Sequence, residues 1–67
     1  MTVTIDDCKK LRPDFVLEEG RWVYGTHRAR WTHRGAPYEL YGGEPQHLLD
    51  VCHRQMVVRD EMEGARR

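Results

Sequence analysis

Apolar and polar residues alternate along the middle of the chain in the pattern typical of β-strands. The polar residues 18–21 separate two apolar runs, 15–17 and 22–24. With Glu19 and Gly20 as a two-residue turn, the two runs pair as antiparallel strands and place large apolar side chains on one face. This spacing predicts a first β-hairpin centred on these two residues.

A second hairpin follows, with Arg34 and Gly35 as its turn. That register pairs Thr32 with Pro37, at a position where the missing proline amide removes no ladder hydrogen bond. The register also divides the remaining side chains between two faces. The apolar face carries Ala29, Trp31, Tyr38 and Leu40, and the opposite face carries Arg28, Arg30, Glu39 and Tyr41. The first face is predicted to belong to the core and the second to face solvent.

Gly25 lies between the two predicted hairpins, where strict alternation would mix aromatic and charged side chains on one face of the sheet. Alternation alone would place Trp22 and Tyr24 on the same face as Arg28 and Arg30. A bulge or bend at Gly25 shifts the pattern by one residue and returns both aromatic residues to the apolar face. A single bent strand and two short strands both satisfy this pattern, so the sheet is expected to have three or four strands.

The chain after Gly43 has the spacing of an amphipathic helix. Pro45 fits the first helical turn, where a backbone amide is not needed. Six apolar residues fall within one broad half of the helical wheel: Leu48, Leu49, Val51, Cys52, Met56 and Val58. The helix is predicted to end near Arg59 or Met62, and residues 63–67 are expected to fray.

A short helical turn ending at Leu11 is predicted near the N-terminus. Thr4 or Asp6 supplies the capping oxygen, and Pro13 limits the turn because the residue before a proline avoids helical geometry. The predicted architecture is therefore α+β. It is a small antiparallel meander of three or four strands packed against one C-terminal helix, in a single domain spanning residues 1–67.

The charges balance over the whole chain but not along it. The 67 residues hold 11 Lys and Arg and 11 Asp and Glu, which gives a formal net charge of zero. Residues 20–38 contain four arginines and no acid, whereas residues 1–19 and 39–67 each carry a net charge of −2. A basic centre between two mildly acidic ends bears on partners and on electrostatic steering more than on the fold.

Composition argues against several classes of protein. No apolar run approaches the roughly 20 residues of a membrane span, and the first residues lack the basic-then-apolar order of a signal peptide. Two cysteines, Cys8 and Cys52, are too few and too far apart for a disulfide framework. A cytoplasmic protein with reduced thiols and no membrane contact is expected.

Six residues are of the types that ligate metals: Cys8, His27, His33, His47, Cys52 and His53. Zinc sites usually collect ligands from short paired spacings, and none of the spacings here directs two side chains to one point. Catalysis has no better candidate, since the chain has no serine and Cys52 lies on the apolar face of the predicted helix. The sequence therefore predicts no metal, no cofactor and no enzymatic activity.

The basic centre carries the functional hypothesis. The residues expected to form a partner-binding face are Arg21, Arg28, Arg30, Arg34 and Tyr41. Arginine and tyrosine are enriched at the energetic centres of interfaces, and a β-ribbon is a rigid frame for them. We expect a non-enzymatic regulator or inhibitor that docks on a larger macromolecule, namely a protein with an acidic or nucleic-acid-binding surface. Small size, few cysteines and the lack of a motif are typical of phage and mobile-element accessory proteins, such as anti-CRISPR-type inhibitors.

A nucleic-acid-binding β-ribbon, as in a small transcriptional regulator, is the alternative hypothesis. The same arginines can follow a phosphate backbone while Tyr41 stacks on a base. Against this alternative, the net charge is zero, Glu39 is expected to neutralise Arg30, and most aromatic residues are expected in the core. A homodimer is a further expectation, because 67 residues supply only a small core.

Overall fold

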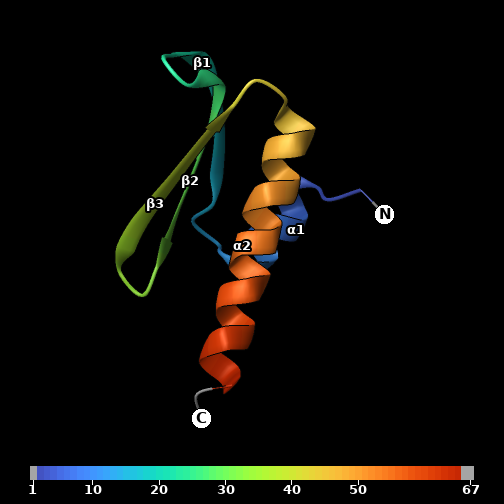
Figure 1. Ribbon diagram of the computed structural model, residues 1–67, viewed down its shortest axis with the longest axis vertical. Coiled ribbons are helices and arrows are strands. Elements are labelled where there is room, and N and C mark those ends of the chain that lie inside the picture. The colour runs from blue at the N-terminus through green and yellow to red at the C-terminus, as the bar shows by residue number, and fades with distance from the viewer. Residues whose placement is uncertain (1, 66–67) are drawn as a thin grey trace.

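A computed structural model describes residues 2–65 of the chain (Figure 1). Its elements, in order, are α1 (Ile5–Leu11), β1 (Val16–Trp22), β2 (Gly25–His33), β3 (Ala36–Gly42) and α2 (Pro45–Ala65). The strands form one antiparallel sheet in the order β1-β2-β3. The predicted α+β architecture is confirmed, and the sheet has three strands rather than four.

Both helices cover the same face of the sheet (Figure 1). α2 runs along β2 and β3, and α1 packs against α2. The other face carries no helix in the described part of the chain, and we call it the open face. Successive side chains along a strand therefore point either into the core or to the open face. Neither of the described helices is long and apolar enough to cross a membrane.

The hydrophobic core lies between the two helices and the inner face of the sheet. Its buried residues are Cys8, Phe15, Ala29, Trp31, Leu48, Leu49, Cys52 and Met56. The ring of Trp31 stacks on Tyr38 with centroids 5.9 Å apart and meets Phe15 at 6.2 Å. Aromatic rings bury about 150–250 Å² each, so these three side chains supply much of the stabilisation in a core of this size.

The β2–β3 hairpin has the register that the sequence predicts. Thr32 pairs with Pro37 as predicted, and the same register pairs Trp31 with Tyr38 and Arg28 with Tyr41. Arg34 and Gly35 have φ of 53° and 80°, the left-handed geometry that both central residues of a type I′ turn require. Ala29 and Trp31 are buried, so the predicted core face of this hairpin is confirmed.

The predicted first hairpin, with its turn at Glu19-Gly20, is wrong. These residues lie inside β1, and the chain turns at Val23 and Tyr24 instead. β1 pairs along β2, with Leu17 opposite Ala29. The longer pairing is favoured because an isolated hairpin with three-residue strands is marginal, whereas β1 adds a third strand to an existing sheet.

The irregularity in the sheet lies in β1 and not at Gly25. Glu19 pairs with His27 and Trp22 pairs with Gly25, so β1 accommodates one extra residue between these pairs. Gly25 instead allows the backbone of β2 to approach that of β3 closely, because a Cβ there would lie 2.5 Å from the backbone oxygen of Gly42. The bulge leaves Trp22 half-buried on the open face and not in the core as predicted.

The start of α1 is fixed by a capping box. The Thr4 hydroxyl accepts a hydrogen bond from the Asp7 amide at 3.2 Å, and the Asp7 carboxylate accepts one from the Thr4 amide at 2.9 Å. Thr4 is therefore the N-cap, and Asp6 lies in the first turn. The bonds to Thr4 hold the pKa of Asp7 below its usual value.

α2 continues through turns that the sequence predicts to fray. It reaches Ala65 rather than ending near Arg59 or Met62, and residues 66–67 lie outside the described part of the chain. The last buried side chain of α2 is Met56. The turns after Met56 are therefore held by contacts other than burial in the core.

Candidate functional site

The open face brings together three of the five residues that the sequence predicts for partner binding. Arg28 and Tyr41 lie opposite one another on β2 and β3, and Arg30 lies two residues further along β2. Glu18 on β1 accepts a hydrogen bond from Arg28 Nη2 at 3.1 Å and forms an ion pair with Arg30 Nε at 2.9 Å. Hydrogen bonding to Tyr41, and then to Glu18, raises the pKa of Arg28. One carboxylate therefore orients both guanidinium groups.

An aromatic cluster covers the end of the open face beside the β1–β2 turn. Trp22 packs edge-on against Tyr41 with ring centroids 6.0 Å apart, and Tyr24 lies 5.8 Å from Tyr41. The guanidinium of Arg28 sits 4.8 Å from the Trp22 ring centroid, within the range of cation–π attraction. Val23 is 93% exposed and Tyr24 is 77% exposed, so Tyr24 is not the core residue that was predicted. We call Val23 and Tyr24 the tip.

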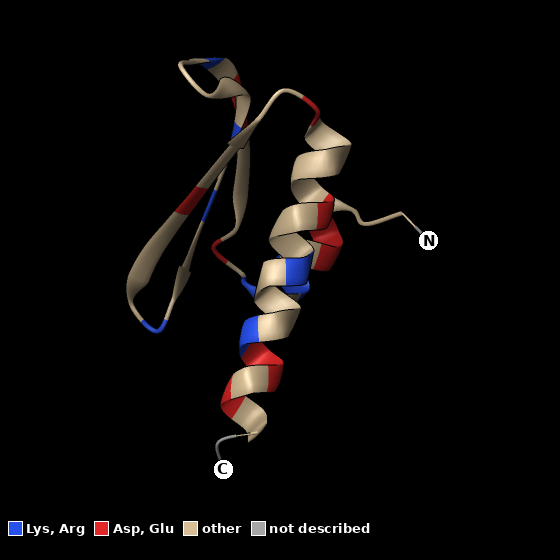
Figure 2. Cartoon of the chain, viewed as in Figure 1, with Lys and Arg blue, Asp and Glu red and all other residues tan. Residues whose placement is uncertain are grey.

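The other two predicted residues, Arg21 and Arg34, lie at opposite ends of the sheet. Basic residues are found at both ends of the sheet in Figure 2. Arg21 is exposed on the bulged part of β1, next to Trp22 in the chain. Arg34 occupies the β2–β3 turn, where its Nη2 lies 3.3 Å from the Glu63 carboxylate of α2. Arg21 therefore adjoins the aromatic cluster, whereas Arg34 is separated from it by the length of β2.

A shallow depression of about 290 Å³ occupies the other half of the open face. Its lining residues are Asp14, Val16, Arg30, Trp31, Thr32, Pro37, Tyr38 and Glu39. The Asp14 carboxylate accepts hydrogen bonds from the Thr32 hydroxyl and from the Thr32 amide, the latter at 2.8 Å. These bonds hold the pKa of Asp14 below its usual value and fasten the start of β1 to the end of β2.

The charges of the open face nearly cancel. Glu18 forms ion pairs with both Arg28 and Arg30. Glu39 lies opposite Arg30 in the β2–β3 register, but the ion pair of Arg30 is with Glu18 and not with Glu39 as the sequence predicts. Glu39 also accepts a hydrogen bond from the Tyr41 hydroxyl at 3.1 Å. The carboxylates of Glu18 and Glu39 therefore offset the guanidinium groups of Arg28 and Arg30, and this face is less basic than the sequence alone indicates.

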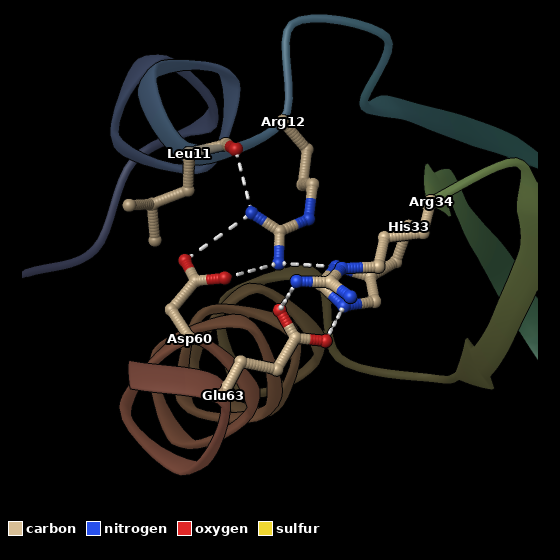
Figure 3. Close-up of polar contacts among 6 residues, drawn as sticks. All are labelled: Leu11, Arg12, His33, Arg34, Asp60 and Glu63. Atoms are coloured by element: carbon tan, nitrogen blue, oxygen red, sulfur yellow. Dashed lines mark hydrogen bonds and ion pairs between the residues drawn. The ribbon is translucent and has the colours of Figure 1, made fainter. Parts of the chain in front are cut away.

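A buried polar cluster, which the sequence does not predict, joins both helices to the end of β2 (Figure 3). Arg12, directly after α1, is only 9% exposed. Its guanidinium donates to the Leu11 carbonyl at 2.7 Å and to both carboxylate oxygens of Asp60 at 2.8 and 3.3 Å. The same group donates to His33 Nδ1 at 2.8 Å. Hydrogen bonding to Arg12 lowers the pKa of Asp60.

His33 links Arg12 to Glu63 within this cluster. A guanidinium can only donate, so His33 Nδ1 must accept and Nε2 carries the ring proton. Nε2 then donates to the Glu63 carboxylate at 2.5 Å, and this bond lowers the pKa of Glu63. Arg34 contacts the other oxygen of the same carboxylate. The cluster thereby connects the end of α1, the end of β2 and the last turns of α2 (Figure 3).

Three side chains of the cluster also have the spacing of a metal site. His33, Asp60 and Glu63 place ligand atoms within 4.8 Å of one another. Arg12, however, puts a cation against both His33 and Asp60, where a metal ion would need to approach. The arrangement fits an internal ion-pair network better than a metal centre. Its signal in the sequence is the three-residue spacing of Asp60 and Glu63, which places both on one side of a helix.

The two cysteines lie in the core, on α1 and α2. Cys8 and Cys52 are free thiols with no exposed surface. Burial raises the pKa of Cys8 to about 11 and that of Cys52 to about 12. Both side chains are therefore protonated at neutral pH and act as small apolar residues, not as nucleophiles.

Comparisons with known proteins leave function to be argued from the residues. No protein-family model, curated protein or solved structure matches the chain. In the buried polar cluster Arg12 is buried, Asp60 and Glu63 are partly exposed, and the charged groups pair with one another, which suits a structural role. The aromatic and arginine side chains of the open face are accessible, and they form the candidate site.

Proposed function

We propose that this chain is a non-enzymatic binding protein that docks on a larger protein through its open face and its tip. One observation carries the proposal: hot-spot residue types gather at one accessible place. These residues are Trp22, Tyr24, Arg28 and Tyr41. Tryptophan, tyrosine and arginine are enriched among the residues that dominate binding energy at interfaces. Tryptophan and tyrosine in addition bury large areas at a low cost in conformational entropy.

The rigidity of the site supports the same proposal. Arg28 is held against the Trp22 ring and by Glu18, and Tyr24 rests against Tyr41. Ordering a mobile side chain at an interface costs about 0.5–1.5 kcal/mol. Side chains that are already held in place avoid much of this cost, so the surface is organised before a partner arrives.

The charge pattern favours a protein partner over a nucleic acid. A phosphate backbone is bound through uncompensated positive charge, and Glu18 already pairs with both Arg28 and Arg30. Arg21, exposed beside the tip, makes no ion pair within residues 2–65. It would meet an acidic group at the rim of the partner's surface.

We expect the chain to act by binding alone, without catalysing a reaction. A chain of this size acts by occupying a surface of its partner, as a regulator or an inhibitor does. The tip supports this mode, because two exposed apolar residues on a two-residue turn form a projection. A projection of this kind fits an apolar recess on the partner.

Affinity capture from host lysate tests the proposal with three baits. The first is the unchanged chain, and the second carries Tyr24→Ala and Arg28→Glu on the open face. The third is a matched control with His47→Ala and Lys9→Glu, at exposed positions on the two helices. We expect one host protein to be captured by the first and third baits and reduced at least about tenfold with the second. Titration with that purified protein then confirms direct binding.

Equal capture by the open-face variant would overturn the proposal, as would loss with the control bait alone. Charge reversal of Arg34 by itself tests whether the far end of the sheet contributes.

Nucleic-acid binding is the second candidate, because Trp22 and Tyr41 lie on the open face where bases can stack. Titration with single- and double-stranded DNA and RNA across a salt series separates the two candidates. We expect no saturable binding at low salt. Affinity that falls steeply with salt and is abolished by Arg28→Glu/Arg30→Glu would favour the nucleic acid instead.

A further inference from the structure

One side of α2, next to the side that packs in the core, carries apolar residues that the core does not use. The core takes Leu48, Leu49, Cys52 and Met56 from this helix. Val58 is 43% exposed and Met62 is 56% exposed. At 100° per residue, Val51, Val58 and Met62 fall within about 40° of one another and so form a continuous stripe. The stripe adjoins the core side of the helix: Val51 is half-buried near Leu40 of β3, whereas Val58 and Met62 are exposed.

Two opposite charges border the stripe. Arg54 and Glu61 are exposed and lie seven residues apart, which places them within about 20° of each other around the helix. Neither makes an ion pair or a side-chain hydrogen bond with another residue of the described range 2–65. Because they are about two helical turns apart, they cannot pair with one another along the same helix.

We propose that a second copy of this chain covers this face, with the two α2 helices packed antiparallel about a two-fold axis near Val58. In an antiparallel pair, facing residues share a common midpoint in the sequence. Three sets of residues satisfy this condition together. Val58 meets Val58 of the second copy, Met62 meets Val51, and Arg54 meets Glu61. The midpoints of all three pairs lie within about one residue of position 57.

Charge complementarity selects this orientation. The two-fold axis repeats each contact, so the antiparallel pair gains two Arg54–Glu61 ion pairs. A parallel pair in register would instead place Arg54 against Arg54 and Glu61 against Glu61. The ion pairs set the orientation more than the affinity, because exposed pairs contribute only about 0–1 kcal/mol each. Affinity comes from the apolar stripe, and one helix face is small, so a weak and concentration-dependent dimer is expected.

This proposal is independent of the proposed function. The tip and the aromatic cluster lie on the open face of the sheet, whereas the stripe lies on α2, which packs on the opposite face of the sheet. The dimer therefore leaves the candidate binding site free.

Sedimentation equilibrium on the purified chain tests the proposal at concentrations from about 10 μM to about 1 mM. We expect the weight-average mass to rise from the 8.0 kDa of one chain towards twice that value. Val58→Asp should keep the protein monomeric throughout the range. Arg54→Glu and Glu61→Arg should each weaken association about tenfold or more, since each sets like charges against one another. The double variant Arg54→Glu/Glu61→Arg should restore it.

Val23→Asp serves as the matched control, since it places the same charge at an exposed valine on the tip and should dimerise like the unchanged chain. Circular dichroism establishes that each variant is folded. A chain that stays monomeric at the highest concentration would overturn the proposal. Undiminished association of folded Val58→Asp, or failure of the charge swap to restore association, would overturn it as well.

Discussion

Gly25 determines how closely the β1–β2 turn approaches the end of β3. A Cβ at this position would lie 2.5 Å from the Gly42 oxygen and 2.6 Å from its carbonyl carbon. Real side chains do not tolerate such contacts, so only glycine permits this approach. The placement of the tip, and with it the candidate site, depends on this one residue.

We expect Gly25→Ala to lower the free energy of unfolding by about 1–3 kcal/mol, because the backbone of β3 must move to admit a methyl group. Gly43→Ala is the matched control, since a Cβ there meets nothing within 4 Å. Its effect should stay within about 0.5 kcal/mol. Urea denaturation followed by tryptophan fluorescence measures both variants. Similar losses for the two would contradict the role given to Gly25.

At the scale of the elements, the β2–β3 hairpin follows from local sequence and β1 does not. Arg34-Gly35 supplies the turn, and the alternation on both sides agrees with it, so short-range rules are sufficient. The register of β1 is decided by its pairing with β2, which local turn signals do not report. Glu19-Gly20 has the composition of a turn, yet Gly20 lies within β1 and leaves room for the ring of Trp22. A Cβ there would lie 2.8 Å from the ring of Trp22.

The sequence likewise predicts the part of the candidate site on β2 and β3, but not the part on β1 and its turn. Arg28, Arg30 and Tyr41 share a face because the β2–β3 register places them there. The sequence predicts Trp22 and Tyr24 in the core because its alternation favours a shift at Gly25, whereas the shift lies in β1. The buried polar cluster draws on three elements that are distant in the sequence. Its assembly depends on the tertiary fold, and spacing within one element cannot reveal it.

The last turns of α2 depend on this cluster. Beyond Met56 the helix is held by Asp60 and Glu63, and by Arg59, whose guanidinium lies 4.6 Å from the Tyr38 ring centroid. Cation–π and ion-pair contacts thus replace burial along this part of the helix. We therefore expect the end of α2 to open separately from its first three turns.

We expect Arg12→Met to loosen the end of α2 selectively, because it leaves Asp60 and His33 without their shared donor. Amide exchange in residues 57–65 should accelerate by about tenfold or more, while residues 45–56 keep most of their protection. Lys9→Met, at an exposed position of α1, is the control and should leave both segments unchanged. Uniform acceleration along all of α2 would show that the helix responds as one unit.

For the molecule as a whole, four carboxylates link stability to pH. Their pKa values are held down by hydrogen bonds from specific partners. The pairs are Asp7 with Thr4, Asp14 with Thr32, Asp60 with Arg12 and Glu63 with His33. Since these pKa values are lower in the folded chain than in the unfolded chain, the folded state favours the ionised form of each group.

The stabilisation from these groups is complete above the unfolded pKa values, 3.8 for aspartate and 4.5 for glutamate, and is lost as the pH falls through the folded values. We therefore expect the free energy of unfolding to decrease below about pH 4.5. Urea denaturation from neutral pH into the acid range measures the slope. Asp14→Asn should flatten it, because an amide does not titrate there. A stability that is constant or rising towards acid pH would contradict this assignment.

The bulge in β1 affects whether strands of other molecules can pair with this edge of the sheet. β1 is an edge of the sheet, and an edge offers unpaired amides and carbonyls to any strand from another molecule. The register shift between Glu19 and Trp22 interrupts that row, and Arg21 places a charge within it. Strands from neighbouring molecules therefore find no continuous ladder to extend. The same irregularity that turns Trp22 outward therefore makes the β1 edge a poor template for a strand of another molecule.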